Sequence, residues 1–193
     1  MNRRQFIQTT GIALTAAGCA SVAGFASSKS LNENIKISSV IVDNGSSVAA
    51  KFGQNMSKLG FDVKKIGLHS AHLPFDNLVL NQCKSGSVFA GLTTMETFTC
   101  FEQIARDKWM KPVYVGVHYP NSNNMMHRLE GHQDVINRFE RNMKNESWTD
   151  SLLLSLTNMP SLARQSNKEL QSQRLSEDTE MLVSWVIAPI HNV

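Results

Sequence analysis

The sequence lacks the short motifs that identify most nucleotide-binding sites and serine or cysteine nucleophiles. Its 193 residues contain no GxGxxG, no GxxxxGK[ST], no GxSxG and no CxxC, and only three cysteines are present. A basic stripe interleaved with aromatic residues is also missing, which argues against nucleic acid as a partner. The remaining signals are the N-terminal segment, the hydrophobic pattern and a small set of polar residues.

The composition is that of a folded protein of nearly balanced charge. Hydrophobic residues make up 41% of the chain, which is enough for a real core. Residues 1–26 contain two arginines and no acid, so the rest of the chain carries 17 basic and 16 acidic residues. The length and composition predict one domain.

Residues 1–26, MNRRQFIQTTGIALTAAGCASVAGFA, follow the plan of an export signal: paired arginines, then an acid-free and mildly apolar stretch. The apolar part is too short for a confident membrane span. Arg3, Arg4 and Phe6 fit the twin-arginine motif, which this segment closely resembles. The resemblance implies export in a folded state by the twin-arginine (Tat) machinery, and we expect residues 27–34 to be a flexible lead-in.

Two processing routes are compatible with this leader. Small residues at Gly24 and Ala26 suit ordinary signal peptidase, and cleavage there would release the protein into the periplasm. Residues 16–19, AAGC, resemble a lipobox, although the usual leucine three places before Cys19 is absent. We expect ordinary cleavage near Ala26, with lipid anchoring through Cys19 as the alternative.

The clearest local pattern lies in residues 87–120, and it predicts a strand, a helix and a second strand. Residues 88–92 form a nearly unbroken apolar run, typical of a strand that is covered on both faces. Thr93 and Thr94 offer N-cap hydroxyls, and Pro112 prevents the helix from continuing into residues 113–117. The unit therefore resembles a crossover between parallel strands.

The same alternation extends over residues 35–193, which we predict to be a single α/β domain. The expected strands are 35–42, 61–68, 88–92, 113–117 and 182–187, and the expected helices include 131–144 and 148–159. Residues 162–173 are weakly helical. Alternating strands and helices predict a three-layer, mostly parallel sheet of four to five strands with helices on both faces, flavodoxin-like or Rossmann-like.

The polar residues that follow the predicted strands suggest a ligand site. In a doubly wound sheet, ligands bind outside the carboxyl ends of the strands. The residues expected to meet there are Asp43, His69, Thr94 and His118, with the 119–132 loop as a cover. They predict binding of a small polar or anionic ligand, while the cofactor stays unknown.

Two further functions stay open at this level. His69, His72 and His118 would suit a metal-dependent hydrolase or oxidoreductase, because neutral imidazole is a common ligand of zinc and copper. Alternatively, the chain is a non-catalytic partner subunit. Cys83 and Cys100 are compatible with a disulfide or with two free thiols.

The body of the chain also loosely resembles small twin-arginine-exported α/β proteins that have no assigned activity. The segments that carry this resemblance are 89–94 (FAGLTT), 101–107 (FEQIARD) and 183–189 (VSWVIAP). It implies no catalytic residue.

Overall fold

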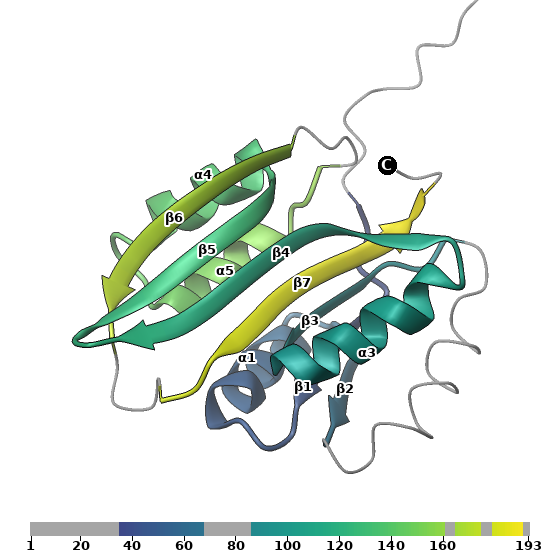
Figure 1. Ribbon diagram of the computed structural model, residues 1–193, viewed down its shortest axis with the longest axis horizontal. Helices are drawn as coiled ribbons and strands as arrows, with labels where there is room; N and C mark the ends of the chain where they lie inside the picture. The colour runs from purple at the N-terminus through teal and green to yellow at the C-terminus, as the bar shows by residue number, and fades with distance from the viewer. Residues whose placement is uncertain (1–34, 68–85, 161–164, 175–178, 191–193) are drawn as a thin grey trace, which may run out of the picture.

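The computed structural model describes residues 35–67, 86–160, 165–174 and 179–190, which form one seven-stranded sheet with helices on both faces (Figure 1). The strands are β1 (Ser39–Asp43), β2 (Val63–Ile66), β3 (Phe89–Thr93), β4 (Met110–Asn121), β5 (Asn124–His132), β6 (Gln165–Gln173) and β7 (Leu182–Pro189). The helices are α1 (Ser47–Lys58), α3 (Met95–Arg106), α4 (Gln133–Asn142) and α5 (Trp148–Leu156).

The sheet is mixed, and the predicted mostly parallel fold of four to five strands is wrong. The strand order is β2-β1-β3-β7-β4-β5-β6. β1 runs parallel to β2 and to β3, whereas the pairs β3–β7, β7–β4, β4–β5 and β5–β6 are antiparallel. The last strand of the chain inserts between β3 and β4, which separates the two strands that the crossover unit was expected to join as neighbours.

The parallel part of the sheet follows its sequence signals closely. Ser46 caps α1 by accepting the Ala49 N–H at 3.1 Å, and Thr94 caps α3 by accepting the Thr97 N–H at 3.4 Å. Each helix buries one stripe of apolar residues against the sheet. β2 lies at the edge of the sheet, and its two lysines suit that position because charged side chains protect an edge strand from pairing with other chains.

Residues 119–132 form a hairpin and not a covering loop. β4 continues to Asn121, and β5 returns from Asn124 through a tight turn in which Ser122 has a φ of 52°. Residues in β5 alternate between buried and exposed, with Met125 and Leu129 inside and Arg128 outside. This period of two is the strand signal, and the Asn-rich turn beside it obscured it.

β6 replaces the weak helix that was predicted over 162–173. Its sequence, QSNKELQSQ, is almost entirely polar, and its residues alternate between exposed and half-buried positions. The strand pairs with β5 from Gln165 to Gln173. The pairing with β5 therefore overrides a sequence of low strand propensity.

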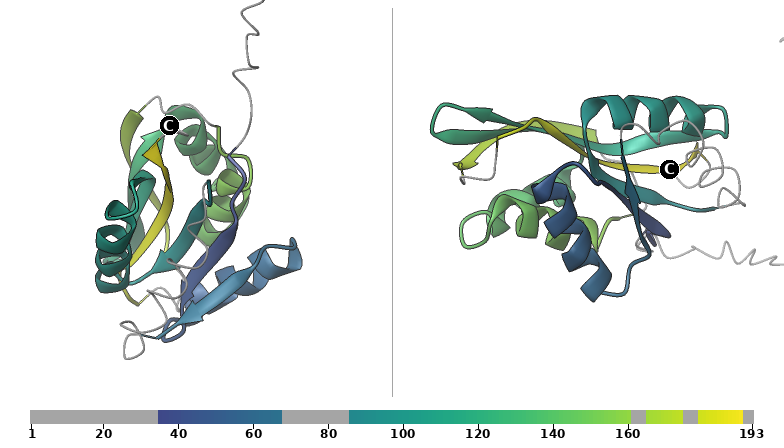
Figure 2. Two further views of the ribbon diagram at one scale, coloured as in Figure 1. Left: turned by 90° about the vertical axis from the view of Figure 1, so that its right-hand side faces the viewer. Right: turned by 90° about the horizontal axis from the view of Figure 1, so that it is seen from below.

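Two separate cores lie on the two faces of the sheet. α3 packs over β7 and β4 on one face, called here the α3 face, while α1, α4 and α5 cover the other, called the three-helix face (Figure 2). The α3 face buries Phe101 and Trp185, and the three-helix face buries Phe52, Phe139 and Trp148. None of the described helices is long and apolar enough to cross a membrane.

Candidate functional site

Two of the predicted ligand-binding residues meet at the carboxyl ends of β1 and β3. Asp43 is the last residue of β1, and its Oδ1 accepts the Gly45 N–H at 2.8 Å. The Thr94 hydroxyl donates to Thr97 Oγ1 at 3.2 Å, and the Thr97 hydroxyl donates weakly to Asp43 Oδ2 at 3.5 Å. A chain of hydroxyl groups thus links the two strand ends, which we call the β1/β3 edge.

Two helices begin at this edge and leave on opposite faces of the sheet. α1 follows β1 onto the three-helix face, and α3 follows β3 onto the α3 face. Their N-terminal N–H groups carry partial positive charge. Asp43 is 3% exposed, and Glu96 lies in the first turn of α3, so two carboxylates already sit near these N–H groups.

The other predicted contacts do not join this edge. His118 lies within β4 and points into the three-helix core, where its ring stacks on Trp148 with centroids 4.6 Å apart. Asp43 instead contacts α3 on the opposite face, and strands β3 and β7 lie between β1, which carries Asp43, and β4, which carries His118. His69 and His72 lie outside the described residues.

His118 belongs instead to a buried chain of four polar side chains. His118 Nδ1 and His127 Nδ1 are 2.8 Å apart. His118 Nε2 lies 2.7 Å from Ser184 Oγ, and His127 Nε2 lies 2.8 Å from Ser172 Oγ. Four strands contribute to this chain, which runs β7, β4, β5, β6 across the sheet and is called here the histidine relay.

The relay has two self-consistent proton arrangements. In the first arrangement, Ser172 donates to His127 Nε2, and His127 Nδ1–H donates to His118. His118 Nε2–H then donates to Ser184, and the Ser184 hydroxyl donates to the Gly116 carbonyl at 3.4 Å. In the second arrangement, each of these hydrogen bonds between side chains has the opposite direction, and the Ser172 hydroxyl donates to the Gln173 carbonyl at 3.4 Å. Both arrangements satisfy two neutral rings, because each imidazole then has one donor and one acceptor nitrogen.

Aromatic packing and burial keep both rings uncharged. Trp148 packs on both imidazoles, and the Phe139 and His127 ring centroids are 5.4 Å apart. Burial lowers the pKa of His127 to about 4. Burial also lowers the pKa of His118 well below its ordinary value, and the neighbouring His127 adds to this effect. The two rings are therefore neutral at pH 7.

The relay is not arranged as a metal site. Each of the four ring nitrogens has a hydrogen-bond partner within the chain, so none is directed at an open position. Among the described residues there is no group of three or more His, Cys, Asp or Glu that could hold a metal ion. His132 is engaged elsewhere, because its Nδ1 accepts the Asp134 N–H at 3.1 Å at the start of α4.

Tyr114 lies beside the inner end of the relay. Burial raises its pKa above the ordinary value, and the nearby Ser184 hydroxyl partly offsets this. The Tyr114 hydroxyl makes no hydrogen bond of good geometry within the described residues. Ser184 is itself fully buried, so this end of the relay is closed to solvent.

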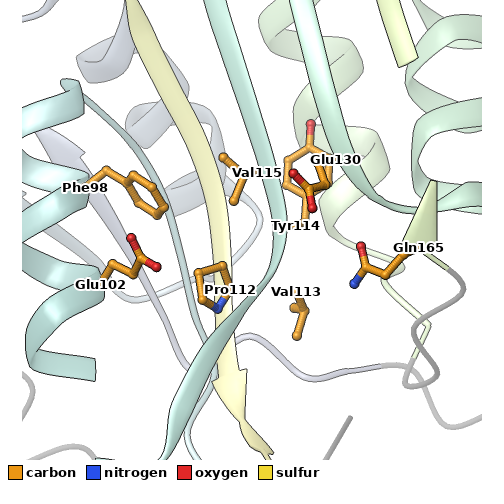
Figure 3. A pocket seen from close by; sticks show the side chains of 8 residues that line it. All are labelled: Phe98, Glu102, Pro112, Val113, Tyr114, Val115, Glu130 and Gln165. Atoms are coloured by element: carbon orange, nitrogen blue, oxygen red, sulfur yellow. The ribbon is translucent and has the colours of Figure 1, made fainter. Parts of the chain in front are cut away.

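A shallow hollow of about 300 Å³ lies on the α3 face, beside α3 and over the start of β4 (Figure 3). Its lining residues are Phe98, Glu102, Pro112, Val113, Tyr114, Val115, Glu130 and Gln165. Glu102 is already paired with Arg106 at 2.9 Å. The volume is at the lower limit for small-molecule sites.

His127, Ser172 and Ser184 are the residues that sequence reasoning did not place. His127 falls within the 119–132 segment that was expected to be a covering loop, and the two serines carried no motif. The alternation along 124–132 would have located His127 in a strand facing inward. Nothing in the sequence predicts that β6 and β7 bring the serines to the two rings.

Cysteine chemistry is limited in the described part of the chain. Cys100 is a free, half-buried thiol on α3, and Cys83 lies outside the described residues.

Comparison with known proteins found no matching family model, no matching curated protein and no matching solved structure.

Proposed function

We propose that this chain is an exported protein that binds a small polar ligand at the β1/β3 edge. The observation that carries the proposal is the hydroxyl chain from Thr94 through Thr97 to the buried Asp43, at the point where α1 and α3 diverge. In open α/β sheets, ligands bind outside the carboxyl ends of strands at the position where successive helices leave on opposite faces. In this sheet, β1 and β3 are the adjacent parallel strands with that property.

The charges at the edge favour an uncharged or cationic ligand over an anion. Asp43 is buried beneath the helix N-termini, and Glu96 occupies the first turn of α3. An anion placed among these N–H groups would meet two carboxylates at short range, which raises its free energy. A ligand with hydroxyl or amine groups would instead donate to Asp43 and exchange hydrogen bonds with Thr94.

Thermal unfolding in the presence of ligand candidates tests this binding site. Glucose, putrescine and inorganic phosphate serve as probes for a polyol, an amine and an anion. We expect glucose or putrescine, but not phosphate, to raise the unfolding temperature, because a ligand that binds only the native state stabilises it. Asp43→Asn and Thr94→Val should each abolish the shift measured against their own baselines.

The matched control is Thr99→Val, since Thr99 is exposed on α3 and its hydroxyl bonds only to the Met95 carbonyl within its own helix. That variant should keep the full shift. A shift with phosphate alone, or one that survives in Asp43→Asn, would contradict the proposed site and ligand class.

The export part of the proposal depends on the arginine pair in the leader. In a bacterium with a twin-arginine machinery, Arg3→Lys combined with Arg4→Lys should leave the protein in the cytoplasmic fraction. Gln5→Asn, which keeps both arginines, should still be exported to the periplasm. Equal export of the two variants would refute a twin-arginine signal.

A further inference from the structure

The two ends of the histidine relay differ in their access to solvent. Ser184 is fully buried near the start of β7. Ser172 is half-buried on β6, which pairs with β5 alone among the described strands and so forms one edge of the sheet. A molecule from solution can therefore reach Ser172 but not Ser184.

Around Ser172 the distances are those of a nucleophile, a base and an orienting group. Ser172 Oγ lies 2.8 Å from His127 Nε2, and His127 Nδ1 lies 2.8 Å from His118 Nδ1. An activated serine needs a base within about 2.6–3.2 Å that is held in turn by a third group. We propose that Ser172 is a nucleophile for acyl esters, with His127 as its general base and His118 as the positioning residue.

The proton arrangement that this chemistry needs is one of the two that the relay permits. His127 must keep the lone pair of Nε2 free, so its proton lies on Nδ1 and is donated to His118. His118 is then protonated on Nε2 and donates to Ser184 Oγ, and the Ser184 hydroxyl donates to the Gly116 carbonyl. The neutral state of His127 at neutral pH leaves this lone pair available.

The reaction balances within these residues and the substrate. Ser172 Oγ bonds to the acyl carbon while its proton passes to His127 Nε2. The ester C–O bond then breaks, and the alcohol leaves with that proton. Water later attacks the acyl-serine, again delivering a proton to His127, and the acid and free Ser172 are released.

The free edge of β6 offers an N–H group for the negative charge that develops on the carbonyl oxygen. Arg174 N–H donates to the Asn123 carbonyl at 3.3 Å, toward β5. Successive residues of a strand direct their N–H groups to opposite sides, so the N–H groups of Gln171 and Gln173 point away from β5. These two N–H groups flank Ser172 and lie about 7 Å apart along the strand, so one of them, and not both, can donate to a single oxyanion.

Reaction with an alkyl fluorophosphonate tests the proposal on the full chain. Ser172 Oγ should bond to phosphorus as fluoride leaves, and intact mass should show one adduct that peptide mapping places on Ser172. Ser172→Ala should lose the adduct. Ser166→Ala, which removes a half-buried serine from the same face of β6, should keep it. His127→Gln should slow labelling by at least about 100-fold.

Absence of an adduct on the wild-type chain, or an adduct that persists in Ser172→Ala, would overturn the proposal. Nitrogen-15 NMR of the wild-type histidines provides a test that needs no substitution. We expect a proton on Nδ1 of His127 and on Nε2 of His118 at pH 7. The reverse arrangement would also overturn the proposal, because His127 would then donate to Ser172 and could not accept its proton.

Discussion

Gly91 packs directly against the Trp185 ring in the core of the α3 face. A Cβ atom at position 91 would lie 2.4 Å from the Trp185 ring and 2.9 Å from the Ile41 carbonyl oxygen. The indole is also fixed by a hydrogen bond from its Nε1 to Thr93 Oγ1 at 3.0 Å. The absence of a side chain at residue 91 is therefore what allows β7 to lie beside β3.

Gly91→Ala should destabilise the protein, because neither the indole nor the β1 backbone can move without breaking other contacts. Overpacking of this kind costs about 1–3 kcal/mol. Chemical denaturation of the variant and of the exposed control Thr99→Val measures the difference. A Gly91→Ala variant as stable as the wild type would show that Trp185 is not packed on this glycine.

We expect the core around His127 and His118 to lose stability in acid. The pKa of His127 is about 4 in the folded chain, against about 6.5 in the unfolded chain, so the unfolded state binds more protons between these values. The free energy of unfolding should thus be highest above pH 6.5 and fall as the pH is lowered toward 4. For His127 the loss at pH 4 is about 3 kcal/mol.

Denaturation midpoints measured from pH 7.5 to pH 4 test this loss. The double variant His118→Phe with His127→Leu removes both rings together and should flatten the profile across this interval. An equally steep decline in the double variant would assign the acid sensitivity to other groups.

At the scale of elements, the sequence predicted local structure better than it predicted sheet pairing. α1, α3, α4 and α5 follow from caps and apolar stripes, and β3 and β7 follow from apolar runs. The direction of β7 and its insertion between β3 and β4 depend on contacts between distant segments, which no local pattern records. β6 was missed because its residues are polar, and its pairing with β5 is what makes it a strand.

In the candidate site too, residues placed by local structure were easier to predict than residues placed by the pairing of distant strands. The structure links Asp43 and Thr94 through Thr97, because the two residues lie at the ends of strands that are adjacent and parallel. His118 was assigned to the same edge on the assumption that β4 ends near residue 117. β4 instead continues to Asn121 within a hairpin, so His118 faces the core and its hydrogen-bond partners come from two other strands, β5 and β7.

Proline substitutions test the position of β6 as an edge strand. The Arg174 N–H donates to the Asn123 carbonyl on the β5 side, and the direction of the N–H groups alternates along a strand. The Leu170 N–H therefore points toward β5, and the Gln171 N–H points away from it. Leu170→Pro should therefore lose a ladder hydrogen bond at a cost of about 1–3 kcal/mol, while Gln171→Pro should cost little. Thermal unfolding of the pair measures both effects, and equal losses would mean that β6 has a neighbour on each side.

At the scale of the whole molecule, the sheet has a parallel part and an antiparallel part with different properties. β2, β1 and β3 end at the edge where α1 and α3 diverge, while β7, β4, β5 and β6 carry the histidine relay. Asp43 contacts α3 on one face, and the two imidazoles contact α4 and α5 on the other. Binding at the edge and reaction at Ser172 are therefore separable by substitution.

Chemical-shift mapping tests the proposed ligand site most directly. The backbone amides of the nitrogen-15-labelled chain are followed while glucose or putrescine is added. We expect saturable chemical-shift changes at Gly45, which precedes α1, and at Ser47, the first residue of α1. We also expect them at Met95 and Glu96 in the first turn of α3. Binding at the β1/β3 edge would be contradicted if neither probe caused saturable shifts. It would also be contradicted if the shifts were confined to the hollow beside α3 and over the start of β4.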